Sequence, residues 1–188
     1  NGGGVYMAGG KFTLNKGSVI GSTKVNSSNS DEMMNAPAPN IARDSGGGIY
    51  AIGGEIQLKG YVSYNRALNE EGNAGGVYCK DTNLTLDGSE AQISHNESAG
   101  KVGGLYFSAG SGLRTLTLNN RAVISKNTAK KEHKDLLEYI SIKANDEGEK
   151  KSPYVNEVYM DGNSELKVLN HSVLGANQNN FTDGTAYY

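Results

Sequence analysis

Acidic side chains are the first candidates for chemistry, because hydrolysis of a glycosidic bond needs two carboxyl groups, roughly 5 to 10 Å apart, beside the sugar. The acids closest to the apolar segments of this chain are Asp81, Asp87 and Asp161. Each follows such a segment in a polar turn, and they do not recur at one offset in the repeats described below. The sequence therefore predicts no carboxylate pair and no catalytic residue. A Ser-His-Asp triad assembles in space, and the sequence leaves it open.

Histidine and cysteine, which could bind a metal or act as nucleophiles, are few. His95, His133 and His171 fall at unrelated positions, so they predict no metal site. Cys79 is the single cysteine, which excludes an internal disulfide and a metal-thiolate cluster. Its place in an alternating segment predicts an inward, inert thiol. We expect neither a metal nor a cofactor.

Tyrosine has the most regular spacing in the chain. Tyr50, Tyr78 and Tyr106 are separated by 28 residues each, and each follows a glycine and an aliphatic residue. On neighbouring strands, about 4.8 Å apart, they would form a flat aromatic surface, which we call the tyrosine strip. Such a surface suits a glycan or a host or cell-surface protein as partner. The alternative is that the strip only stabilises its sheet or is covered by neighbouring segments.

The tyrosines belong to an internal repeat that occurs five times, with Tyr6 and Tyr159 in the first and last copies. Two further apolar segments follow each tyrosine in a fixed order. The second segments are residues 12–14, 56–58, 84–86, 116–118 and 166–168, and the third are centred on Ile20, Val62, Ile93, Ile124 and Leu174. A unit of 28 residues buries little alone, but stacked units share one core.

The repeat predicts an all-β fold, a right-handed single-stranded parallel β-helix. We expect a three-sheet solenoid of about five coils that forms one domain over residues 1–188. Period-two alternation points Val77 and Cys79 inward and Tyr78 outward, and the other copies follow the same pattern.

Asparagine follows the third segment at a constant offset, in Asn65, Asn96, Asn127 and Asn177. We expect these four residues to form a structural ladder at the corners of the coils. The glycine pairs before each tyrosine predict sharp bends with positive φ.

Two insertions lengthen the repeat, at about residues 24–45 and 130–155. The pattern at 131–140 predicts a short amphipathic helix, with a strand over 137–143 as the alternative. In the first insertion, Pro37 and Pro39 favour an extended excursion. Residues 1–4 already have the sequence of a repeat corner, so we expect a segment of a longer surface protein. Residues 181–188 either cap the last coil or lead into another.

Composition excludes some partners. The net charge is −2 and the basic residues are scattered, so we expect no nucleic-acid binding. No apolar stretch is long enough to cross a bilayer, so we expect no direct membrane insertion of this segment.

The repeat resembles that of the polymorphic outer-membrane proteins, a group of bacterial surface and autotransporter passengers. The resemblance rests on Gly-Gly-Val-Tyr or Gly-Gly-Leu-Tyr, followed by segments such as Ile-Ser-His-Asn at residues 93–96. Val, Ile or Leu stands here where that family has Ala, and Ile or Val replaces its Phe. The resemblance implies a secreted or cell-surface location, associated with the bacterial outer membrane, and an adhesive role.

Two functions are consistent with these observations. The first is a non-catalytic, adhesin-like or structural stalk segment that presents the tyrosine strip. The second is a β-helix that binds or degrades polysaccharide in a groove between the insertions.

Overall fold

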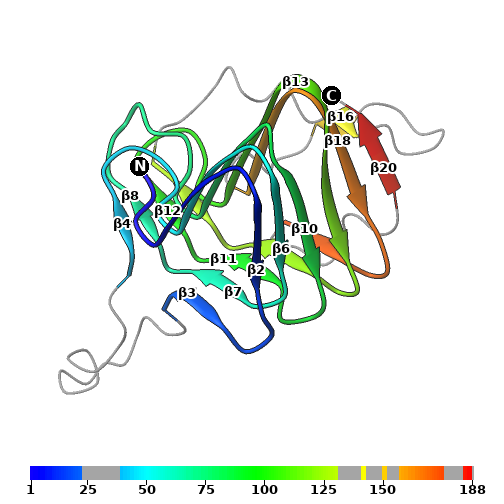
Figure 1. Ribbon diagram of the computed structural model, residues 1–188, viewed down its shortest axis with the longest axis horizontal. Helices are drawn as coiled ribbons and strands as arrows, with labels where there is room; N and C mark the ends of the chain where they lie inside the picture. Colours follow the sequence, from blue (N-terminus) through cyan, green and yellow to red (C-terminus); the bar gives the residue numbers. More distant parts are fainter. Residues whose placement is uncertain (23–38, 131–140, 143–149, 152–156, 176–183, 188) are drawn as a thin grey trace.

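The computed structural model describes residues 1–22, 39–130, 141–142, 150–151, 157–175 and 184–187. All regular structure in these ranges is β-strand, and the strands of successive repeats pair in parallel, as predicted. Figure 1 shows the equivalent strands side by side, with the first repeat at one end and β18 (Val158–Val168) toward the other.

The first and second apolar segments of the repeats form one nine-stranded sheet. Its members include β1 (Val5–Ala8), β5 (Ile49–Ile52), β9 (Val77–Lys80), β2 (Lys11–Leu14), β6 (Glu55–Leu58) and β10 (Asn83–Asp87). The prediction separated these segments into two sheets. They are joined because β13 (Leu105–Asn119) and β18 continue through the bend between the two segments.

The third segments form a five-stranded sheet, and a further set of short strands forms a four-stranded sheet. The five strands are β3 (Val19–Gly21), β7 (Tyr61–Ser63), β11 (Gln92–Ser94), β14 (Val123–Ser125) and β19 (Val173–Leu174). The four are β4 (Ile41–Ala42), β8 (Arg66–Ala67), β12 (Glu97–Ser98) and β15 (Thr128–Ala129). The four-stranded set was not predicted, because two residues are too few to show an alternating pattern.

One apolar core runs through the stacked repeats. Its members come from alternate positions of the first three strand sets, as the period-two pattern predicts, and Cys79, Val77 and Phe107 are fully buried among them. Each repeat therefore adds one layer of aliphatic side chains to a core shared with its neighbours.

The boundaries of the two insertions differ from the prediction. The strand β4 and Ser45 belong to the regular packing, since Ser45 accepts a hydrogen bond from the backbone N–H of Gly2. In the second insertion, β16 (Ser141–Ile142) pairs in antiparallel fashion with β17 (Lys150–Lys151). The predicted helix at 131–140 and the proline excursion lie outside the described residues.

A terminal strand lies beside the last repeat. Strand β20 (Gly184–Tyr187) pairs in antiparallel fashion with the second half of β18, from Glu165 to Val168. This strand occupies an edge that would otherwise present unpaired backbone groups.

Candidate functional site

The five tyrosines of the repeat stand in register on the nine-stranded sheet. Strand pairing aligns Tyr6 with Tyr50, Tyr78, Tyr106 and Tyr159 in turn. Neighbouring rings stack with centroids 4.6 to 5.7 Å apart and interplanar angles of 6° to 15°. We call this set of five residues the tyrosine row; it contains the three members of the predicted strip.

Exposure falls sharply from Tyr6 to Tyr106 along the tyrosine row, and Tyr159 is again half-buried. Tyr6 is 61% exposed, Tyr50 and Tyr78 are half-buried, and Tyr106 is only 8% exposed. Tyr106 is buried because it packs with Ala74 and Val102, which precede the strands β9 and β13. Tyr106 therefore lies outside the main core, as the alternation predicts, but it is covered by these two residues.

The geometry of the row also corrects the expected flat aromatic surface. Parallel rings at these spacings cover one another's faces, so Tyr50 and Tyr78 present their edges and hydroxyl groups to solvent. Tyr6 and Tyr159, at the two ends of the row, each have a face that no other ring of the row covers. Among the described residues, Tyr50 and Tyr78 have no hydrogen-bond partner for their hydroxyl groups. Burial is the main cause that raises the pKa of Tyr78, followed by the neighbouring Tyr50 and then by Asp161, and its hydroxyl group stays a neutral donor.

Polar side chains surround the buried part of the row. The Tyr106 hydroxyl donates a hydrogen bond of 2.9 Å to Oδ2 of Asp161, and burial together with this bond raises the pKa of Tyr106. The ammonium group of Lys101 lies 5.8 Å from the ring centroids of both Tyr106 and Tyr159. This end of the row is therefore fixed by a cation and a carboxylate.

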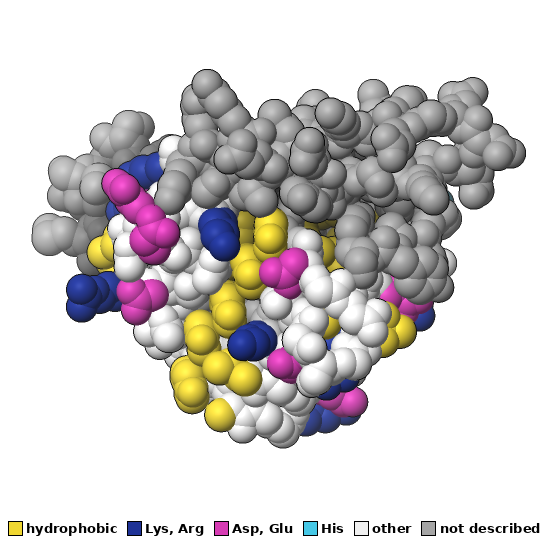
Figure 2. Space-filling view, turned by 90° about the horizontal axis from the view of Figure 1, so that it is seen from above, with side chains coloured by type: hydrophobic (Ala, Val, Ile, Leu, Met, Phe, Trp, Pro, Cys, Tyr) yellow, Lys and Arg dark blue, Asp and Glu magenta, His cyan; other side chains and the backbone are white. Residues whose placement is uncertain are grey.

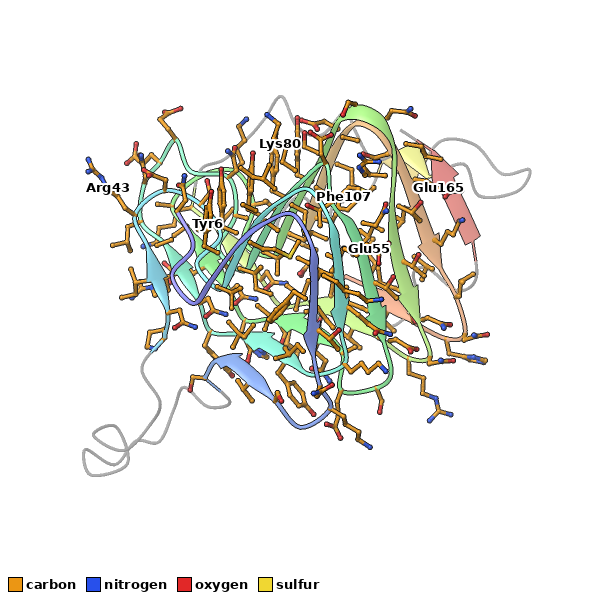
Figure 3. The ribbon with its side chains drawn as sticks, in the orientation of Figure 1. Tyr6, Arg43, Glu55, Lys80, Phe107 and Glu165 are labelled. Carbon is orange, nitrogen blue, oxygen red and sulfur yellow. The ribbon has the colours of Figure 1, made fainter. Side chains whose placement is uncertain are left out.

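A second outward row runs beside the tyrosines, two residues further along each strand. Its members, aligned by strand pairing, are Ala8, Ile52, Lys80, Ser108 and Asp161. Figure 2 looks onto one side of the molecule, where hydrophobic side chains form a band bordered by basic and acidic ones. Figure 3 places Tyr6 and Lys80 on the upper part of the molecule. The sheet thus presents apolar, cationic and anionic groups in sequence.

Several acids near this face have internal partners. Asp81 accepts hydrogen bonds from the backbone N–H groups of Gly110 and Ser111, and these bonds lower its pKa. Glu165 accepts from the hydroxyl of Thr115 and pairs with Lys167 at 2.9 Å. These carboxylates hold the bends of β13 and β18 in place.

Metal-binding groups do not converge in the described part of the chain: no three His, Cys, Asp or Glu side chains are placed to hold an ion there. His95 instead stacks on Tyr64 with centroids 4.7 Å apart, and His133 lies outside the described residues. Within the described ranges, no helix has the length and apolar character needed to cross a membrane.

Three of the four predicted ladder asparagines form a buried hydrogen-bonded line. The backbone N–H and side-chain amide of Asn65 both donate to Oδ1 of Asn96, at 2.9 Å each. Asn96 donates in the same two ways to Asn127. Asn177, the fourth predicted member, lies outside the described residues.

Both ends of this line involve residues that the sequence analysis did not assign. Asn40 donates to Oδ1 of Asn65 at 3.0 Å. At the other end, Oε2 of Glu157 accepts from the side-chain amide of Asn127 at 2.6 Å and from its backbone N–H at 3.2 Å. The signal for Glu157 was available, because it stands where four other repeats have glycine. Asn40 follows a long insertion, so no repeat spacing marks it.

Comparison of the chain with protein-family models, with curated proteins and with solved structures found no match. The candidate site therefore rests on the geometry of the tyrosine row and its polar neighbours.

Proposed function

We propose that this chain is a right-handed, single-stranded parallel β-helix whose solenoid displays the tyrosine row. Support for the solenoid comes from the register: every described strand of the first three sets pairs in parallel with its equivalent in the next repeat. Parallel strands joined by crossovers are right-handed in about 98% of known cases, which supports the handedness.

The proposed role is that of a non-catalytic, adhesin-like segment, secreted or displayed on a bacterial cell surface. The observation that carries this proposal is the tyrosine row itself, five stacked rings that cross successive repeats on one sheet. Tyrosine supplies contact area with little loss of side-chain entropy, and each hydroxyl adds a polar contact. A row of this length suits an extended partner, either a glycan or a surface protein.

The internal bonding of the nearby acids supports a role in binding. Catalysis of glycoside hydrolysis needs one acid to donate a proton and another to act as nucleophile or base. Asp161 accepts from Tyr106, Asp81 accepts from two backbone groups, and Glu165 pairs with Lys167. These contacts hold all three carboxylates in place through groups of the protein itself.

A glycan array followed by a reducing-sugar assay on the bound glycans tests this function. We expect binding without release of reducing ends. Release would instead establish the polysaccharide-degrading alternative. If the array gives no binding, the attachment of the protein to intact cells, before and after proteolysis of their surface, tests for a protein partner. Failure to bind both the glycans and the cells would contradict the adhesive role.

A further inference from the structure

The exposed edge of the tyrosine row is a hydrogen-bond donor surface. Stacking hides the ring faces, whose electron density is negative, and leaves the ring edges, which are positive, beside the hydroxyl groups. The hydroxyl groups of Tyr50 and Tyr78 have no acceptor among the described residues. A ligand on this edge therefore meets positive C–H groups and O–H donors. Ligands that carry oxygen acceptors should interact with it most favourably.

Two lysines reinforce this character. Lys80 is exposed in the row beside Tyr78, and Lys101 lies beside Tyr106 and Tyr159. Neither forms an ion pair within the described residues, in contrast with Lys11, Lys16 and Lys130, each of which pairs with a glutamate. Two cations that have no ion-pair partner in the described part of the chain thus stand next to the donor edge.

The carboxylate of Asp161 limits where an anion can bind. It lies in the same outward row as Lys80, two strands further along, and accepts the hydrogen bond of Tyr106. An anionic group is therefore favoured beside the ammonium groups of Lys80 and Lys101. It is disfavoured toward Asp161 and Asp81, whose charges raise the pKa of Tyr78. Ile52, which is 38% exposed, precedes Lys80 in that row and offers an apolar contact for the carbon face of a sugar.

We infer that the ligand of the tyrosine row is an anionic polysaccharide, held by the hydroxyl groups of Tyr50 and Tyr78 and by the ammonium groups of Lys80 and Lys101. This inference rests on the proposed function and adds the chemical class of the ligand. The net charge of the chain is −2, so its overall field does not favour a polyanion. A preference for an anionic ligand would therefore come from these hydroxyl and ammonium groups and not from the net charge of the chain.

Dextrans of matched length test the inference, because unmodified dextran, carboxymethyl dextran and dextran sulfate share one backbone and differ in charge. We expect the charged forms to bind about tenfold more tightly than the neutral one, the scale of two exposed ion pairs. The carboxymethyl and sulfate arms distinguish which anion the site prefers. Added salt should reduce the preference.

Lysine variants locate the effect. Lys80→Gln and Lys101→Gln should each lower the ratio of affinities for charged and neutral dextran several-fold. Lys59→Gln, the same change in the turn after β6, should leave this ratio unchanged. Equal binding of neutral and charged dextrans that weakens in Tyr78→Phe would overturn the anionic class and leave the proposed function standing. A preference that survives both lysine changes would overturn the site. No binding to any dextran would overturn the inference. The proposed function would still be tested by the glycan array and the cell-attachment assay.

Discussion

The backbone of Gly76 lies directly against the side-chain amide of Asn96: a Cβ atom at Gly76 would sit 2.8 Å from Nδ2 of that residue. The same relationship joins Gly48 to Asn65 and Gly104 to Asn127, at 2.9 and 2.8 Å. The sequence analysis assigned the glycine pairs to bends with positive φ. These three glycines do not have positive φ. The repeat requires glycine here because the asparagine amide and a backbone carbonyl of the next repeat occupy the space that a Cβ atom would need.

Gly76→Ala should destabilise the protein by about 1 to 3 kcal/mol, because the added methyl group would overlap both the Asn96 amide and the carbonyl oxygen of Gly104. Urea unfolding measures the change. Gly110→Ala is the matched control, since its nearest contact would be 3.4 Å away, and it should shift stability by less than about 0.5 kcal/mol. Equal effects of the two substitutions would contradict the packing argument.

Asn96→Ala should cost about 1 to 3 kcal/mol, because it leaves the amide groups of Asn65 without their buried acceptor. The midpoint of thermal unfolding reports the loss. An unchanged midpoint would show that the ladder contributes nothing to stability.

Glu157→Gln should make stability less dependent on pH. Burial raises the pKa of Glu157 above its ordinary value of 4.5, although the hydrogen bonds from Asn127 oppose the shift. Between the unfolded and folded pKa values the folded state holds more protons, so the contribution of Glu157 to stability falls as pH rises through this window. A glutamine keeps an acceptor for Asn127 and carries no charge.

Denaturant unfolding of both proteins at several pH values measures this effect. The glutamine variant should gain stability relative to the parent as the pH rises from about 4 to about 7. A stability difference that is constant over this range would mean that Glu157 has the same pKa in the folded and unfolded states.

Cys79 should react with a thiol reagent only after unfolding. Its side chain is fully buried, and burial strongly raises the pKa of the thiol, which removes the reactive thiolate. Labelling followed by mass spectrometry, with and without denaturant, tests this expectation. Rapid labelling of the native protein would reverse the assignment of faces in β9.

The sequence predicted those parts of the fold in which one physical requirement repeats. Alternation placed Val77 and Cys79 in the core and Tyr78 outside it, because the period of a strand is two residues. Strand β8 was missed because Arg66–Ala67 has no alternating pattern to detect.

The candidate site was less accessible to sequence reasoning. The sequence analysis placed the tyrosines on neighbouring strands as a flat surface, but it did not give the orientation of the rings, whose faces cover one another. The burial of Tyr106 depends on Val102, and the cation near it on Lys101, both from the turn before β13. Such contacts between a turn and a neighbouring strand have no period in the sequence.

Two substitutions at Tyr78 separate binding from stability. Tyr78→Phe keeps the ring between Tyr50 and Tyr106 and removes only the hydroxyl group, so it should leave unfolding nearly unchanged and weaken ligand binding. Tyr78→Ala breaks two stacked pairs, each worth about 0.5 to 1.5 kcal/mol beyond the area buried, and should lower stability. It should also weaken binding by about 1 to 3 kcal/mol, the scale of an aromatic hot spot. Titration with a glycan from the array and urea unfolding of each variant provide the measurements. Unaltered binding by both variants would place the ligand elsewhere on the molecule, and the row would then serve only to stabilise the sheet.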